Sequence, residues 1–93
     1  MRTIERTNAF KRDYKRVKAM PKHRDIDALL PDVVKLLTED RPLPPKDSDH
    51  PHAGEWKDHR DCHIKPDLVL IYRKPDADVL QLVRLGSHAE LYG

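Results

Sequence analysis

The second half of this 93-residue chain gathers ionisable side chains of the kind that move protons. Three are histidines and two are aspartates, and an arginine and a tyrosine near the end of the chain follow them. Because histidine titrates near neutrality, such a set can accept a proton, donate one and hold an anion. Such a combination can cut a phosphodiester. The residues are His50, Asp61, His63, Asp67, Arg84, His88 and Tyr92.

Three predicted strands must position these groups, at about residues 56–64, 68–73 and 79–85. Residues 74–78 are predicted to form the turn between the last two strands. Because the three strands follow one another directly, we expect an antiparallel meander. The sequence therefore predicts a small sheet that carries most of the ionisable residues.

Period-two alternation then places single side chains on the sheet, because residues i and i+2 of a strand face the same side. Asp61 and His63 share one face, opposite the core pair Cys62 and Ile64. Arg84 is expected on the same open face, opposite to its apolar neighbours. His88 would arrive after a bend, and His50 would reach the face from a connecting loop. The other histidines, His23, His52 and His59, are predicted to lie on the surface.

The first half of the chain predicts one short strand and two helices. The strand covers about residues 2–6, and the first helix starts with Asn8 as N-cap and closes at Met20-Pro21. The second helix, about residues 25–39, contains Pro31, so it either kinks or restarts there. A proline-rich connector follows at residues 41–45. We therefore expect an α+β fold, with two N-terminal helices packed on a small twisted antiparallel sheet and one domain over residues 1–93.

Positive charge is concentrated at the start of the chain. Residues 1–24 hold nine basic and two acidic side chains, a net charge of +7. Such a stretch suits nucleic acid, because neutralising phosphates releases counterions. A solvated helix face is the alternative reading. The residues predicted to bind a ribosome or a protein partner are Lys11, Arg12, Lys15, Arg16 and Lys18.

The composition narrows the setting in which the chain would act. The single cysteine, Cys62, cannot form an internal disulfide and is expected to be a small core residue. The N-terminus lacks the apolar stretch of a signal peptide or membrane span. The expected location is the cytoplasm, with no membrane partner.

Several segments together resemble one known family, the YafQ branch of the RelE-like toxins of bacterial type II toxin–antitoxin pairs. The resemblance covers essentially the whole chain and is tightest over residues 47–92. Two positions depart from the family pattern, His52 and Leu68, and we expect them to affect substrate fit. The matching segments are Asp49-His50-Pro51, Gly54-Glu55-Trp56-Lys57, Arg60-Asp61-Cys62-His63, Pro66-Asp67, Leu70-Ile71-Tyr72, Arg84-Leu85-Gly86-Ser87-His88 and Leu91-Tyr92.

The resemblance implies a ribosome-dependent mRNA endoribonuclease that needs no metal ion or other cofactor and is restrained by a protein antitoxin. It also implies a RelE-like fold, in agreement with the predicted elements. We expect Tyr92, Arg60 and Lys57 to contact the RNA substrate. The catalytic set implied by the resemblance is His50, Asp61, His63, Asp67, Arg84 and His88.

Within that set, His50 is predicted to act as base and His88 as acid, although these two roles are interchangeable on sequence grounds. His63 and Arg84 would hold the phosphate, and Asp61 and Asp67 would orient the imidazoles. Other readings stay open: Asp67 could simply open a turn, and Arg84 could pair with a carboxylate. The whole chain could also be a metal-dependent hydrolase or a non-catalytic RNA-binding module.

Overall fold

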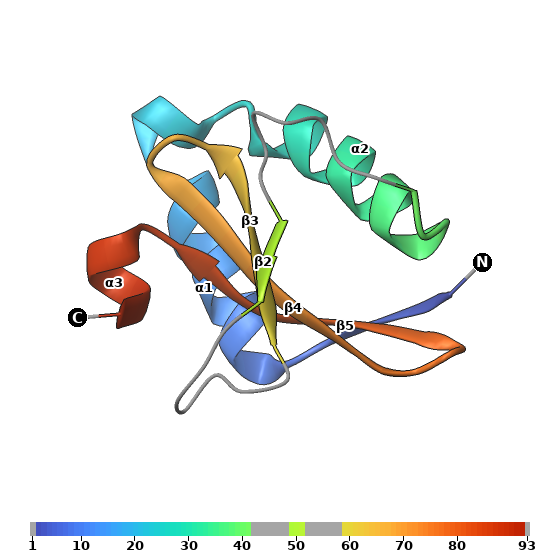
Figure 1. Cartoon of the computed structure of the whole chain (residues 1–93). Helices are drawn as coiled ribbons and strands as arrows, with labels where there is room; N and C mark the ends of the chain where they lie inside the picture. The colour runs from blue at the N-terminus through green and yellow to red at the C-terminus, as the bar shows by residue number, and fades with distance from the viewer. Residues whose placement is uncertain (1, 42–48, 52–58, 93) are drawn as a thin grey trace.

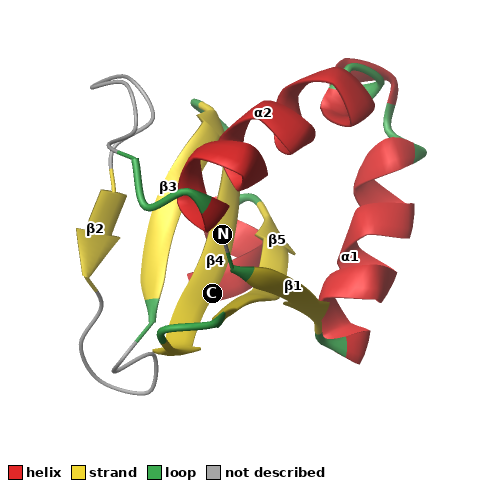
Figure 2. Ribbon diagram, turned by 90° about the vertical axis from the view of Figure 1, so that its right-hand side faces the viewer, coloured by secondary structure: helices red, strands yellow, loops and turns green. Residues whose placement is uncertain are grey.

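The computed structural model describes residues 2–41, 49–51 and 59–92. In this part of the chain, two helices cover one face of a sheet and a short third helix lies on the other face (Figures 1 and 2). The elements are β1 (Thr3–Arg6), α1 (Asn8–Lys18), the 3-10 turn η1 (Pro21–His23), α2 (Ile26–Thr38), β2 (Asp49–Pro51), β3 (Arg60–Lys65), β4 (Leu68–Asp76), β5 (Val79–Gly86) and α3 (His88–Tyr92).

The described strands form one sheet in the order β1-β5-β4-β3-β2. The meander β3-β4-β5 is antiparallel, as predicted, and β2 adds to β3 in antiparallel register. β1 runs parallel to β5, with Thr3 opposite Val79, so the sheet is mixed rather than wholly antiparallel. α1 follows β1 directly and leads the chain from this edge strand into the layer of helices. The predicted α+β class, with both N-terminal helices on the sheet, is confirmed.

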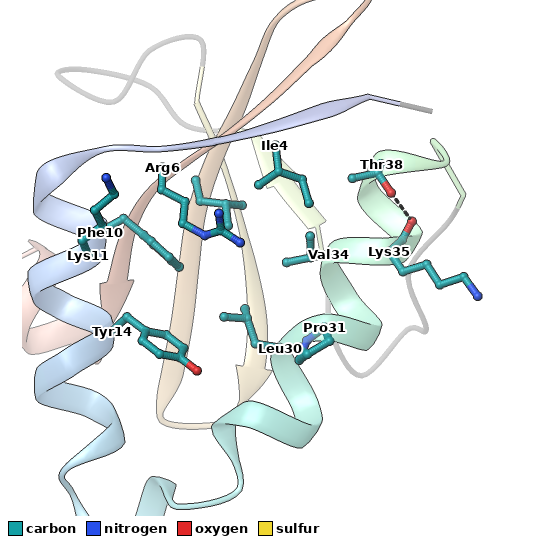
Figure 3. A pocket seen from close by; sticks show the side chains of 11 residues that line it. Ile4, Arg6, Phe10, Lys11, Tyr14, Leu30, Pro31, Val34, Lys35 and Thr38 are labelled. Atoms are coloured by element: carbon teal, nitrogen blue, oxygen red, sulfur yellow. Dashed lines mark hydrogen bonds between the residues drawn. The ribbon is translucent and has the colours of Figure 1, made fainter.

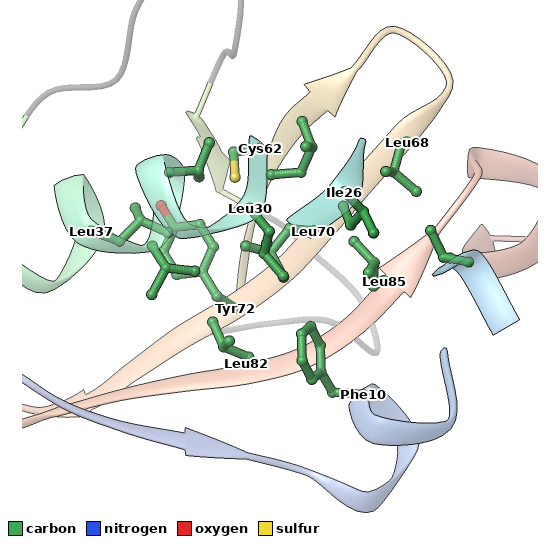
Figure 4. Packing of buried hydrophobic residues seen from close by; sticks show 14 of the residues in the cluster. Phe10, Ile26, Leu30, Leu37, Cys62, Leu68, Leu70, Tyr72, Leu82 and Leu85 are labelled. Carbon is green, nitrogen blue, oxygen red and sulfur yellow. The ribbon is translucent and has the colours of Figure 1, made fainter. Parts of the chain in front are cut away.

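The apolar alternation of the strands divides the buried residues between the two faces of the sheet. Leu70, Tyr72 and Leu82 meet Phe10 and Leu30 in the main core beneath α1 and α2 (Figure 4). The opposite face carries a smaller cluster formed by Val69, Ile71, Val83 and Leu91. Cys62 is fully buried in the main core, as predicted. The small cluster matters for function because it seats α3 on the open face.

The start of α1 shows why the helix begins where it does. Thr7 is the N-cap, and its hydroxyl accepts a hydrogen bond of 3.0 Å from the Phe10 amide, so the prediction of Asn8 as N-cap was wrong by one residue. The Thr7 hydroxyl also donates to the Val83 carbonyl of β5 at 2.7 Å. The cap therefore ties the helix to the sheet. In α2, Pro31 lies inside one continuous helix from Ile26 to Thr38. The helix therefore does not restart at this proline, which was one of the two predicted alternatives.

The strands differ from the prediction at two places. β4 continues through Asp76, so the turn before β5 is limited to residues 77–78. β2 was not predicted as a strand, and it gives His50 a place in the sheet instead of in a loop. The predicted residues Lys57, Trp56 and His52, and most of the proline-rich connector, lie outside the described residues.

A groove of about 650 Å³ opens between α1, α2 and β1 (Figure 3). Ile4, Phe10 and Leu30 are among its apolar lining residues, and the basic residues Lys11 and Lys35 also line it. Among the described residues, no helix is long and apolar enough to cross a membrane.

Candidate active site

Two of the three predicted catalytic histidines meet on the open face of the sheet. Nε2 of His63, on β3, lies 3.1 Å from Nε2 of His88, on α3, and the two ring centroids are 5.3 Å apart. At this distance one ring nitrogen can donate a hydrogen bond to the other, and the tautomers of the two rings decide which one donates. His88 is exposed and His63 is half-buried, so a substrate can reach both rings.

The path of the chain after β5 explains this meeting. His63, Val69 and Gly86 form one row across β3, β4 and β5. α3 starts two residues after Gly86 and folds back over the sheet, where Leu91 packs on Val69 and Ile71. This packing carries His88 across β4 to His63.

Asp61 and Tyr92 form a second contact on the same face. Asp61 is only 4% exposed, and the Tyr92 hydroxyl donates to its Oδ2 at 3.1 Å. The Tyr92 ring also lies against His88, with centroids 5.3 Å apart. Burial and the neighbouring carboxylate raise the pKa of the Tyr92 phenol. The sequence predicted a contact of Tyr92 with the RNA substrate and did not predict this hydrogen bond to Asp61.

Arg84 pairs with a carboxylate of α1 and not with the histidines. The β4–β5 register shifts between Ile71 and Tyr72, and Arg84 stands opposite Ile71, a member of the small cluster on the α3 face. Its guanidinium turns to α1, where Nε and Nη2 contact the Asp13 carboxylate at 2.6 and 3.2 Å. The register therefore keeps Arg84 on the face that carries Ile71, but Asp13 holds its guanidinium, and its predicted contact with the phosphate stays a prediction. The alternative, a pairing with a carboxylate, describes the observed contact.

Asp13 itself is a buried residue that the prediction did not single out. Burial alone would raise its pKa, but hydrogen bonds from Arg84, the Leu85 amide and Arg16 hold the pKa below its ordinary value. One sequence signal could have found it: Asp13 lies three residues after Phe10 and four before Val17, on the buried stripe of α1. The same ion pair raises the pKa of Arg84.

Asp67 is exposed in the turn between β3 and β4. Its carboxylate pairs with the Lys22 ammonium of η1 at 3.1 Å, and that hydrogen bond lowers the pKa of Asp67. The structure thus brings Asp67 to Lys22 and not into the pairing of His63 with His88. The neighbouring His23 is 3% exposed, so its prediction as a surface residue was wrong. Leu68, one of the two departures from the family pattern, is buried in the main core.

The remaining predicted site residues lie along β2 and β3. His50 pairs through its backbone with Asp61 of β3. It therefore lies on the strand next to the one that carries His63. Arg60 is exposed at the start of β3, where it pairs with Pro51. Lys57 lies outside the described residues, so its predicted contact with RNA stays a prediction.

The basic side chains of α1 divide into two groups. Lys11, Arg12 and Lys15 are exposed, while Lys18 pairs with Asp27 of α2 at 2.9 Å. Arg16 turns inward and contacts Asp13 at 2.7 Å. The exposed members keep a positive face on α1, and Arg16 belongs to the packing between α1 and the end of β5.

Comparison with known proteins agrees with this fold. The family model described as "Bacterial toxin of type II toxin-antitoxin system, YafQ" matches residues 2–93. The mRNA interferase toxin YafQ of Escherichia coli is 38% identical over 92 residues, which span 99% of this chain and 97% of that protein.

Two solved structures extend the comparison. The E. coli DinJ-YafQ complex contains a chain that superposes with a TM-score of 0.84 at 37% identity, with all of both chains covered. A copper-bound mutant toxin from Helicobacter pylori superposes with a TM-score of 0.85 at 38% identity, covering 98% of this chain and 99% of that one. The α+β fold is thus that of a small bacterial toxin. This chain belongs to the YafQ family of type II toxin–antitoxin systems, which confirms the resemblance seen in the sequence.

Proposed function

We propose that the chain is a ribosome-dependent mRNA endoribonuclease that arrests translation. The observation that carries this proposal is the 3.1 Å contact between Nε2 of His63 and Nε2 of His88 on an accessible face. The name of the E. coli relative, an mRNA interferase toxin, supports mRNA as the substrate. RNA also suits the chemistry, because the ribose 2′-OH is an internal nucleophile next to the scissile phosphorus.

In the proposed reaction, a base takes the proton of the 2′-OH and the oxygen attacks phosphorus. The bond from phosphorus to the 5′-oxygen breaks, and an acid protonates that oxygen, leaving a 2′,3′-cyclic phosphate and a free 5′-OH. We assign His50 as base, His88 as acid and His63 to the phosphate. Each acid–base group contributes on the order of 10² to 10⁴ in rate.

The other predicted catalytic residues support this set from the surrounding elements. Asp61 anchors Tyr92, whose ring lies against His88. Arg84 is bound to Asp13. We therefore propose that Arg84 helps to hold in place the end of β5, from which the chain continues to His88. Asp67 is bound to Lys22. We therefore propose that the histidines, and not Asp67, carry out the proton transfers.

The test is cleavage of a defined message on bacterial ribosomes by the purified chain. We expect a cut in the ribosome-bound message, a 2′,3′-cyclic phosphate end, and no cut when the scissile nucleotide lacks its 2′-OH. His50→Ala, His63→Ala and His88→Ala should each lower the rate on the order of 10² or more. Asp32→Asn, at an exposed position of α2, is the matched control and should keep the wild-type rate.

Two results would overturn the assignment. A His88→Ala variant that cuts at the wild-type rate would remove the proposed acid. A wild-type chain that binds ribosomes without cutting the message would favour the non-catalytic RNA-binding module instead.

We also propose a protein antitoxin as partner. The basic face of α1 and the groove beside it support this part of the proposal, as does the solved complex of the E. coli relative with DinJ. An acidic, partly disordered segment would complement the charge of α1. Expressed alone, the chain should stop bacterial growth, and co-expression with its antitoxin should restore growth. Normal growth with abundant folded chain and no antitoxin would contradict the toxin function.

The spacing of the histidine pair also favours a second property, binding of a transition metal. Two imidazole nitrogens at about 2.0–2.1 Å from one ion lie about 2.9–3.4 Å apart, which brackets the observed 3.1 Å. The described residues contain no group of three or more metal-ligating side chains, so the pair would bind the ion without a third described ligand. A copper-bound relative supports the idea.

A metal on these nitrogens would occupy the lone pairs that proton transfer uses, so we propose that it inhibits. Calorimetry with Cu²⁺ should show one site that His88→Gln removes, and cleavage should fall as that site fills. A chelator selective for transition metals should leave cleavage intact. Loss of cleavage with that chelator would instead favour the metal-dependent hydrolase.

A further inference from the structure

The Asp13 carboxylate receives four hydrogen bonds at the junction of α1 with the end of β5. Oδ2 accepts from Arg84 Nε at 2.6 Å and from the Leu85 amide at 3.0 Å. Oδ1 accepts from Arg16 Nη1 at 2.7 Å and from Arg84 Nη2 at 3.2 Å. Asp13 is 3% exposed, so these four donors replace the water that the carboxylate loses on burial. The carboxylate therefore fixes two consecutive residues of β5.

The same junction continues into α3 through Arg16. Arg16 donates from Nη2 to the Leu85 carbonyl at 3.1 Å, and its Nε pairs with Glu90 Oε2 at 3.0 Å. Glu90 Oε1 accepts from the Ser87 amide at 2.9 Å, and the Ser87 hydroxyl accepts from the Glu90 amide at 3.1 Å. These reciprocal bonds form a capping box at the start of α3. Asp13, Arg16 and Glu90 thus form a continuous chain of contacts from α1 to the first turn of the helix that carries His88.

Gly86 lets these parts approach so closely. A Cβ at this position would lie 3.0 Å from Arg16 Nη2 and 3.2 Å from Glu90 Oε1. Both distances are too short for an ordinary carbon contact, so a side chain there would push Arg16 and the α3 cap away. The junction between β5 and α3 is therefore closely packed, and His88 lies two residues after Gly86.

We propose that Asp13 is a positioning residue: it holds Arg84 and Leu85 so that α3 leaves β5 in the direction that brings His88 to His63. The consequence for cleavage depends on the proposed function, but the alignment of the two rings does not. Asp13 hydrogen-bonds to two consecutive residues of β5, Arg84 and Leu85, and acts on His88 through that strand. A misplacement of about 1 Å at reacting groups can cost a factor of about 10² in rate.

The test compares Asp13→Asn with Asp32→Asn, the same substitution at an exposed position of α2. In the ¹⁵N-labelled free protein, the nuclear Overhauser effect between the ring protons of His63 and His88 should be strong in the wild type and in the control. It should be weakened or lost in Asp13→Asn. On ribosome-bound mRNA, kcat of Asp13→Asn should fall at least tenfold while KM stays within about twofold. Asp13→Glu, which keeps the charge, should recover part of kcat.

A second variant covers the case in which Asp13→Asn does not fold. Arg16→Met removes one donor to Asp13 and the link to Glu90 but leaves Arg84 on the carboxylate, and it should also weaken the ring-to-ring effect. A wild-type ring contact and wild-type kcat in folded Asp13→Asn, or in Arg16→Met if the former does not fold, would overturn the proposal. If the wild type does not cleave, the proposed function fails, and the ring contact still decides whether Asp13 positions His88.

Discussion

The hydroxyl of Tyr92, near the end of the described chain, donates a hydrogen bond of 3.1 Å to Oδ2 of Asp61, a buried carboxylate of β3. This contact joins the last turn of α3 to the strand that carries His63. Because the Tyr92 ring also lies against His88, one side chain connects a buried anion to the proposed acid. The residue is 37% exposed, so its ring keeps a surface on which a base can stack.

Tyr92→Phe removes the hydroxyl and keeps the ring, so it separates the contributions of these two groups. We expect it to lower the free energy of unfolding by about 1.5–3 kcal/mol, because one hydrogen bond to a charged group is lost. Cleavage should fall only a few-fold, since the ring still lies beside His88. Tyr92→Ala should reduce cleavage much further and cost more stability, because it also removes the packing of the ring. Urea denaturation and single-turnover cleavage measure the two effects, and equal cleavage by Phe and Ala variants would show that the ring has no role.

Alkaline pH should weaken the fold through the same phenol. The pKa of Tyr92 is raised in the folded protein by burial and by Asp61, while in the unfolded chain it is about 10. The contribution of the phenol is therefore complete below pH 10 and is lost as the pH rises from there through the folded pKa. We expect the difference in unfolding free energy between wild type and Tyr92→Phe to shrink above pH 10. A constant difference up to pH 11 would contradict this linkage.

Acid pH should weaken the fold through the ion pair of Asp13, whereas alkaline pH weakens it through Tyr92. Hydrogen bonds from Arg84, Leu85 and Arg16 hold the pKa of Asp13 below its ordinary value, despite its burial. Its contribution is therefore complete above about pH 4, the pKa in the unfolded chain, and is lost as the pH falls through the folded pKa.

Asp13→Asn tests this acid dependence. At pH 7 it should lower the free energy of unfolding by about 3 kcal/mol, because it leaves Arg84 partly buried without its anion. Denaturant titrations between pH 7 and pH 2 should show this loss diminishing below pH 4. Asp32→Asn supplies the baseline for removing an exposed carboxylate, and a loss that is independent of pH would point to packing rather than charge.

Reversal of the exposed charges on α1 should weaken ribosome binding. We expect the triple variant Lys11→Glu, Arg12→Glu, Lys15→Glu to sediment less with ribosomes and to show a flatter dependence on salt. Each lost phosphate contact lowers the slope of log K against log salt by about 0.7–0.9. Arg16 is left in place because it binds Asp13 and Glu90.

The matched control for α1 reverses three exposed basic residues on other parts of the chain, Arg24, Lys35 and Arg41. It changes the net charge by the same amount. If this control weakens sedimentation as strongly as the α1 variant, overall charge and not α1 governs the binding.

Local pattern alone was enough to predict much of this protein. The apolar stripes of α1 and α2 and the alternation of β3 depend on residues three, four or two positions apart. They correctly placed Cys62 and Ile64 in the core, and Asp61 and His63 together on the other face. The family could likewise be recognised from the series of motifs between His50 and Tyr92.

Tertiary structure decided the contacts that complete the site. Arg84 stands opposite Ile71 in the sheet, and only the packing of α1 on β5 shows that Asp13 receives its guanidinium. The return of α3 across β4 decides that His88 meets His63 and that Tyr92 meets Asp61. These pairs lie 25 to 71 residues apart in the chain. Local propensities specify helices and strands, but such distant pairings depend on strand register and on how the elements pack, which no short window of sequence contains.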